Sequence, residues 1–160
     1  MLGKAQPMRP PLEGSFGLAP AWLLARIEDS PGVLGLGDGM PAFEHTILHE
    51  RPDQFAVILF RPATGIRHIV EVQLGEADTA QVARALRHWE DESGQLPGIE
   101  HRVAIAAERI TPAVAIAAQH ARRNYPLDAV ELHVQRTGEV VTVRGETVAI
   151  PDPGTVLTGH

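Results

Sequence analysis

The feature that most limits how this chain can fold is a pair of apolar segments joined by a short turn. Residues 54–60 are almost entirely apolar, while residues 66–74 place apolar side chains at alternate positions. A strand that is apolar throughout has to be buried on both of its faces. The residues between the two segments, 61–65, have the composition of a turn. The pair therefore predicts a β-hairpin inside a sheet that is covered on both sides.

The rest of the sequence predicts the helices and strands that would complete such a sheet. A helix is expected from Pro20, a second from the N-cap Asp78 to about Glu92, and a third from Thr111 to about Asn124. Further strands are predicted at residues 46–50, 101–107, 129–135 and 139–144, and residues 146–150 are a candidate for a last short strand. The order α-β-β-β-α-β-α-β-β predicts an α/β (α+β) fold, in which helices flank a mixed β-sheet.

A length of 160 residues is that of one ordinary domain. Residues 1–17 are rich in Pro and Gly and lack periodicity, so they are predicted to be a flexible N-terminal tail. Residues 18–150 are predicted to form the domain, and residues 151–160 a flexible C-terminal tail.

Charge and missing residue types exclude several classes of protein. The chain has no cysteine, which excludes disulfide scaffolds and thiolate metal sites. No apolar run approaches the ~20 residues that span a bilayer, and no signal segment is evident, so we expect a cytoplasmic protein without membrane contact. The net charge of −6 argues against a wide basic surface for nucleic acid. Lys4 is the only lysine, so the body of the protein has none to offer for catalysis.

Two carboxylates and an amide stand at one end of the predicted hairpin. If the turn has five residues, Phe60 lies opposite Ile66, and Asp53 then lies opposite Gln73 and diagonal to Glu71. The three polar side chains would converge on one face, although a register shift of one residue would separate them. Two converging carboxylates suit a hard cation such as Mg²⁺, which can polarise a phosphodiester.

The pattern Pro52-Asp53…Glu71-Val72-Gln73, on a hairpin followed by a helix, resembles the motif of the PD-(D/E)XK nuclease superfamily. Residues 70–75, continuing through Arg84 to residues 88–90, are also similar to a group of little-characterised bacterial proteins assigned to that superfamily. The similarity covers about residues 20–135. It implies a restriction-endonuclease-like fold.

The resemblance also implies roles for the motif residues. Asp53, Glu71 and the backbone carbonyl of Val72 would hold Mg²⁺ or Mn²⁺. Asp53, Glu71 and Gln73 would form the catalytic set, with Gln73 at the position of the family's lysine. A glutamine amide can bind a water molecule but carries no charge, although some members of the superfamily tolerate it.

Other residues could complete the implied site. Arg67 or Arg84 could reach it and supply the missing positive charge. The family often adds a glutamate from its first helix, for which Glu28 and Glu44 are the candidates.

The predicted function is therefore a metal-dependent nuclease that hydrolyses phosphodiester bonds in DNA, in defence, restriction or repair. The alternative is a nuclease-like fold that has lost catalysis and serves as an interaction or assembly module, which the acidic net charge and Gln73 favour. Contacts to DNA are expected from a narrow group of arginines, namely Arg61, Arg67, Arg84 and Arg87. A partner protein could supply further basic surface, and an exposed sheet edge predicts a homodimer.

Two other patterns suggest different chemistry. Residues 35–39 form a glycine cluster, which is typical of a turn but could cradle a ligand near Gly37 in a small-molecule-binding protein. His45 and His49 are four residues apart, a zinc-binding spacing on a helix, yet this segment is predicted to be a strand.

Overall fold

The computed structural model describes residues 19–37 and 40–150, and its elements follow the predicted order. In chain order they are α1 (Pro20–Asp29), the 3-10 helix η1 (Pro31–Leu34), β1 (Ala42–Leu48), β2 (Gln54–Arg61), β3 (Ile66–Glu76), α2 (Thr79–Gln95), β4 (His101–Arg109), α3 (Pro112–Ala121), β5 (Leu127–Thr137) and β6 (Val140–Val148). The predicted fold class is thus confirmed. The two predicted tails lie outside the described residues.

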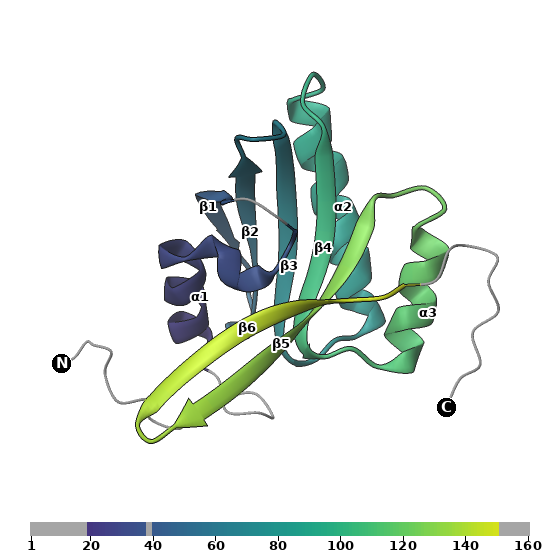
Figure 1. Cartoon of the computed structure of the whole chain (residues 1–160). Coiled ribbons are helices and arrows are strands. Elements are labelled where there is room, and N and C mark those ends of the chain that lie inside the picture. Colours follow the sequence, from purple (N-terminus) through teal and green to yellow (C-terminus); the bar gives the residue numbers. More distant parts are fainter. Residues whose placement is uncertain (1–18, 38–39, 151–160) are drawn as a thin grey trace.

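The six strands form one mixed sheet in which they are arranged in chain order, from β1 to β6. Strands β3, β4 and β5 run parallel, and every other neighbouring pair is antiparallel. Parallel neighbours need a long connection, because the chain has to return to the same end of the sheet. Helices α2 and α3 make these two connections and lie on one side of the sheet, whereas α1 lies on the other (Figure 1).

Alternation along β3 divides its side chains between two hydrophobic cores. Val70 and Val72 lie in the core that contains Leu23 and Ile27 of α1. Ile69 lies in the second core, under α2 and α3. Because side chains two residues apart share a face, Glu71 also points to the α2 side of the sheet.

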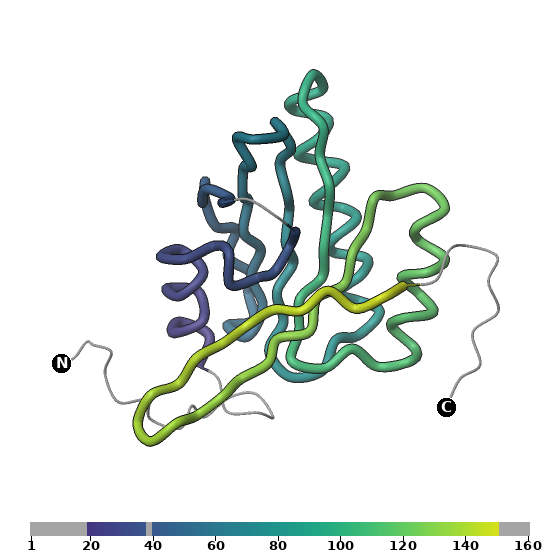
Figure 2. Tube along the Cα trace, viewed as in Figure 1, coloured from purple at the N-terminus to yellow at the C-terminus, as the bar shows by residue number. Residues whose placement is uncertain are grey.

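The structure corrects two predicted strand boundaries. β1 begins at Ala42 instead of residue 46, and the two strands predicted over residues 139–150 are one strand, β6. Gly145 looks like a break in the sequence, since glycine weakens strands. In the structure it pairs with Leu132 in an unbroken ladder. Figure 2 shows β5 and β6 as a long hairpin that extends beyond the rest of the sheet.

The close packing of η1 against β6 explains why Gly35 and Gly145 are glycines. A Cβ at Gly145 would collide with the backbone of Leu34, and a Cβ at Gly35 would collide with the backbone of Gly145. Gly35 also has a φ of +67° where η1 ends, and Gly37 has a φ of +100°. Gly35 and Gly37 therefore let the chain turn after η1, and Gly35 and Gly145 let η1 approach β6.

His68 is a buried ionisable residue on the α1 side of β3. Burial is the main reason why the pKa of His68 falls to about 4, and the charges of Arg61 and Arg102 add to this effect. Asp128 opposes the shift. The Nε2 atom of His68 is buried and has no hydrogen-bond partner among the described residues. His68 is therefore neutral at pH 7.

We predict that His68 makes the fold less stable as the pH falls from 6.5 to about 4. In this window the unfolded histidine binds a proton and the folded one does not, so the free energy of unfolding decreases with decreasing pH. A pKa shift of this size corresponds to roughly 3 kcal/mol. Urea unfolding across this pH range should show a flatter dependence for His68→Asn than for the unchanged protein. Equal pH dependence of the two proteins would contradict the prediction.

Candidate functional site

Glu71 is a carboxylate without exposed surface near the middle of the sheet. Its neighbours in the ladder are Ala56 of β2 and Ile105 of β4. Keeping such a carboxylate ionised costs several kcal/mol unless positive groups or hydrogen-bond donors surround it. The side chains around Glu71 therefore decide what it can do.

Three basic side chains surround this carboxylate. His49 Nε2, just after β1, lies 2.6 Å from Glu71 Oε2, and Arg84 Nε, on α2, lies 3.3 Å from the same oxygen. His88 Nε2, one turn further along α2, lies 3.6 Å from Oε1. The rings of His49 and His88 are nearly parallel, with centroids 5.4 Å apart. Glu71 is thus held between two imidazoles and a guanidinium.

The N-terminus of α2 positions two of these groups. Asp78 caps the helix, as predicted, because its Oδ1 accepts a hydrogen bond from Gln81 N. The buried Gln81 amide donates to the backbone oxygen of Glu71 and to a backbone oxygen of β4. These bonds fix the helix to the sheet. Arg84 and His88 are four residues apart, so they share the helix face that is turned toward Glu71.

Burial shifts the pKa values of two of these groups toward their neutral forms. It raises the pKa of Glu71, although His49 and Arg84 oppose the shift. It also lowers the pKa of His88, and the positive charges of His49 and Arg87 contribute. Neutral imidazole is the form that binds metal ions. Glu71 Oε1 is buried and has no hydrogen-bond partner among the described residues, so it is available to a cation.

Three residues of this site have the donor set and spacing of a metal site. One ligand atom each from His49, Glu71 and His88 lies within 4.8 Å of the others, and no second such group of three occurs in the described ranges. Two ligands that are ~2.0–2.1 Å from one tetrahedral ion are themselves about 3.4 Å apart. The observed separations of 2.6 Å and 3.6 Å lie on either side of that value. Small side-chain adjustments would therefore let the three residues hold a divalent cation.

Gln73 uses its whole amide for contacts within the protein. Its Oε1 accepts from Arg84 Nη2 at 2.7 Å and from Gln54 Nε2 at 3.3 Å. Its Nε2 donates to the backbone oxygen of Glu76 and to Asp78 Oδ2. Both donors and both lone pairs are therefore occupied. In this arrangement Gln73 anchors Arg84 and has no free donor for a water molecule.

The predicted register of the β2–β3 hairpin was wrong by one residue. Ile66 pairs with Arg61, not with Phe60, and Gln73 consequently pairs with Gln54. The reason is that Arg61 belongs to β2, where its backbone oxygen closes the turn by accepting from the nitrogens of the third and fourth residues after it. The turn is therefore one residue shorter than predicted.

Asp53 consequently does not join the group around Glu71. Its backbone oxygen accepts a hydrogen bond from Leu74 N, and Leu74 belongs to the core on the α1 side. Its carboxylate, 23% exposed, pairs with Arg51 Nη2 at 2.8 Å. Val72 packs its side chain into the same α1-side core, and its backbone lies within the sheet between β2 and β4.

The predicted arginines have different environments. Arg84 reaches the site, as the sequence analysis allowed. Arg67 is buried and pairs with Glu44 at 2.9 Å and with Glu92 at 3.0 Å. Arg61 is also buried and donates to a backbone oxygen that follows η1. Arg67 and Arg61 therefore contribute little exposed surface, and their contact with nucleic acid stays a prediction.

The remaining predicted residues lie outside the group around Glu71. Arg87 is exposed on α2. Glu44, a candidate for the additional glutamate, neutralises Arg67 instead, and Glu28 is exposed on α1. His45 is exposed on β1, so it does not form the zinc pair with His49.

That His49 and His88 meet at Glu71 was not predicted from the sequence. A signal existed for His88, because it lies one helical turn after Arg84 and shares its face. His49 had no comparable signal. Its position depends on where β1 ends and on how the following segment turns toward β2.

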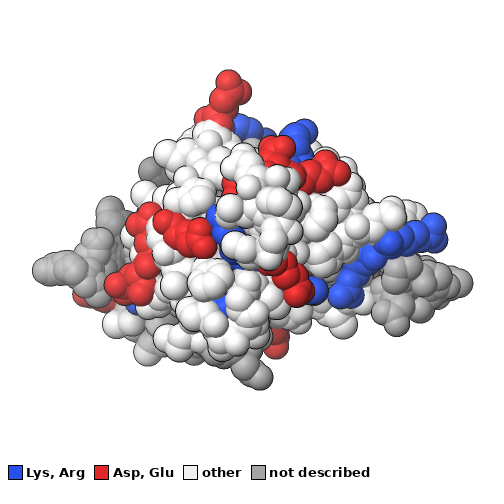
Figure 3. Space-filling view, turned by 90° about the horizontal axis from the view of Figure 1, so that it is seen from above, with Lys and Arg blue, Asp and Glu red and all other residues white. Residues whose placement is uncertain are grey.

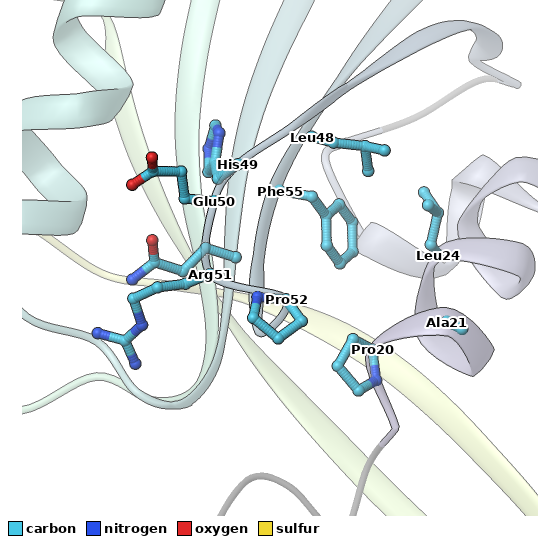
Figure 4. Close-up of a pocket in the computed structure, with 10 residues that line it drawn as sticks. Pro20, Ala21, Leu24, Leu48, His49, Glu50, Arg51, Pro52 and Phe55 are labelled. Carbon is cyan, nitrogen blue, oxygen red and sulfur yellow. The ribbon is translucent and has the colours of Figure 1, made fainter.

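An apolar pocket adjoins the site. It has a volume of about 370 Å³ and lies between the start of α1 and residues 48–55. Figure 4 shows Leu24 near Phe55 on one side and His49 on the other. Because His49 both lines the pocket and contacts Glu71, the pocket extends to the edge of the candidate site.

One face of the molecule shows how the charged side chains are distributed. On the face drawn in Figure 3, basic and acidic side chains are interspersed among uncharged ones, and the described residues form no broad basic area there.

None of the helices in the described part of the chain has the length and apolar character that crossing a membrane requires.

Comparison with solved structures shows what the fold is similar to. It resembles the structure of EndoMS in its apo form, with a TM-score of 0.56 and 15% sequence identity. The match covers 71% of this chain and 47% of the EndoMS chain, so it spans about half of that protein. At this identity the likeness is one of fold, and it agrees with the restriction-endonuclease-like fold that the motif implies. No family model and no curated protein matches the sequence.

We predict that Arg84 stabilises the buried carboxylate. Arg84→Met should lower the free energy of unfolding by about 2–3 kcal/mol, because it removes the donor shared by Glu71 and Gln73. Arg87→Met, an exposed position on the same helix, is the matched control and should change stability by less than about 0.5 kcal/mol. Urea unfolding of both variants tests this, and similar losses in both would contradict it.

Proposed function

We propose that this protein is a metal-dependent nuclease that hydrolyses phosphodiester bonds in DNA. The observation that carries the proposal is the position of Glu71. It is a buried carboxylate on the third strand of the sheet, at the glutamate position of the PD-(D/E)XK-like motif, and groups able to bind a cation surround it. The fold shared with EndoMS, a restriction-endonuclease-like nuclease, supports the same activity.

A divalent cation at Glu71 would act as a Lewis acid toward the phosphate and lower the pKa of a water molecule. In hydrolysis the water oxygen bonds to phosphorus and gives up a proton, while the bond from phosphorus to the leaving oxygen breaks and that oxygen takes up a proton. Negative charge develops on the phosphate oxygens as this happens, and a fixed positive group nearby favours that charge.

We propose Arg84 as that positive group. Its Nη2 is 2.7 Å from Gln73 Oε1, and Gln73 occupies the position of the family's lysine. A guanidinium can hold Glu71 with one nitrogen and Gln73 with another, since its donors form a rigid fork. Arg84 would therefore supply from the helix the charge that the strand lacks.

The remaining roles implied by the resemblance are also proposals. Asp53 and the carbonyl of Val72 would be further cation ligands. To bind a cation, Asp53 would have to give up its ion pair with Arg51. Because Arg51 is mostly exposed, that ion pair is worth at most about 1 kcal/mol. DNA as substrate, a role in defence, restriction or repair, a homodimer, and a partner that supplies basic surface belong to the same proposal.

A second function is an inactive nuclease-like module. The specific observation that favours it is the complete use of the Gln73 amide within the protein, which leaves no free donor at the lysine position. The net charge of −6 favours it as well.

Cleavage of plasmid and single-stranded DNA with Mg²⁺, Mn²⁺, Co²⁺ or Zn²⁺ tests the proposal. Glu71→Gln should lower the cleavage rate at least about 100-fold, because the loss of several kcal/mol of charge stabilisation corresponds to such a factor. Glu76→Gln, at an exposed position on the same strand, is the matched control and should cleave like the unchanged protein.

The outcomes separate the two functions. If the unchanged protein cleaves no DNA with any of the four ions, the inactive module is correct. If it cleaves, Asp53→Asn tests the ligands that the resemblance implies. A loss as large as that of Glu71→Gln would establish Asp53 as a ligand, whereas retained activity would remove it from the site.

A further inference from the structure

We infer that the centre formed by His49, Glu71 and His88 selects a transition-metal ion that binds imidazole, with Zn²⁺ preferred, and binds Mg²⁺ only weakly. The inference rests on the proposed function in one respect, namely that this cation is the one that meets the phosphate. The binding preference follows from the ligand atoms and can be measured separately.

The chemistry of the ligand atoms favours a transition-metal ion. Two of the three candidate ligand atoms are imidazole nitrogens, and the third is a carboxylate oxygen. Mg²⁺ is hard and prefers oxygen ligands and water, whereas imidazole suits Zn²⁺ and its neighbours in the transition series. Two histidines and one glutamate are also the ligand set of a catalytic zinc site that leaves a coordination position open.

The carboxylate of Glu71 can accept a further ligand. The residue has no exposed surface, yet its Oε1 has no hydrogen-bond partner among the described residues. This oxygen lies 3.6 Å from His88 Nε2, which is too long for a hydrogen bond and suits two ligands of one ion. A cation between them would satisfy both atoms.

Neighbouring groups hold the ligands in place. Arg84 donates to Glu71 Oε2, and a donor behind a ligating carboxylate fixes its orientation. His88 is on a helix that Asp78 caps and that Gln81 ties to the sheet. The centre is therefore largely preorganised, with His49 as the ligand outside regular secondary structure.

The Mg²⁺ site implied by the resemblance has less support in these contacts. The carboxylate of Asp53 pairs with Arg51, and the backbone oxygen of Asp53 accepts a hydrogen bond from Leu74 N. Without Asp53, Glu71 is the only carboxylate in the group of three. One carboxylate and two imidazoles are a poor match for Mg²⁺.

Calorimetric titration of the untagged, EDTA-treated full chain with Zn²⁺, Co²⁺, Mn²⁺ and Mg²⁺ tests the inference. Affinity should decrease in the order Zn²⁺, Co²⁺, Mn²⁺, Mg²⁺, with Zn²⁺ bound at least about 100-fold more tightly than Mg²⁺. His49→Ala and His88→Ala should each weaken Zn²⁺ binding at least about 10-fold. The visible absorption of bound Co²⁺ should change in the same variants.

His45→Ala is the matched control, since it removes an exposed histidine four residues before His49 and should bind Zn²⁺ like the unchanged protein. Circular dichroism confirms that each variant is folded. If His49→Ala does not fold, His88→Asn and Glu71→Gln replace it, and both should weaken Zn²⁺ binding. The inference is overturned if Mg²⁺ binds as tightly as Zn²⁺, if the variants bind Zn²⁺ normally, or if no ion binds.

The cleavage assay distinguishes this inference from the proposed function. Zn²⁺ binding that depends on both histidines, without DNA cleavage under any ion, would support the metal centre and reject the nuclease. Cleavage with Mg²⁺ that survives His49→Ala and His88→Ala but not Glu71→Gln would support the nuclease and overturn the inference.

Discussion

The structure around the site depends on the burial of one carboxylate. Glu71 has no exposed surface, and its charge can persist there only beside positive groups and hydrogen-bond donors. Those groups come from α2 and from the segment after β1, so one interaction holds together three parts of the chain that are distant in sequence. The buried Gln81 also ties α2 to β3, because its side-chain amide donates a hydrogen bond to the backbone oxygen of Glu71.

Two of the ionisable residues buried on β3 show two solutions to the same problem. His68, on the α1 side, lies near Arg61 and Arg102 and avoids the cost of a buried charge by remaining neutral. Glu71, on the α2 side, is surrounded by groups that favour its ionised form, although burial still dominates its pKa. Only the second arrangement gathers groups that can bind a ligand. The sheet therefore separates a side that is mainly structural from a side that can support chemistry.

Much of the fold followed from local patterns in the sequence, whereas the site depended on register. Apolar alternation and caps such as Asp78 predicted the element order, because they act within a few residues. The position of Asp53 relative to Gln73 depended on whether Arg61 ends β2 or begins the turn. An arginine is compatible with either position, so the sequence did not decide between them. Glu71 was identified because a carboxylate in an apolar strand is conspicuous. The contact of His49 with Glu71 was missed because only the three-dimensional path after β1 brings His49 to β3.

The exchange of lysine for glutamine at the motif position changes how the site is built. A lysine there would bring a mobile point charge on a flexible stem. Here the charge belongs to Arg84, whose planar guanidinium is bonded to Gln73 and to Glu71 at once. The glutamine is therefore a support for the arginine, and the positive charge is fixed before any substrate arrives. What remains free at the centre is Glu71 Oε1 and the adjacent imidazole of His88, which is why the chemistry of this site depends on the ion that occupies that space.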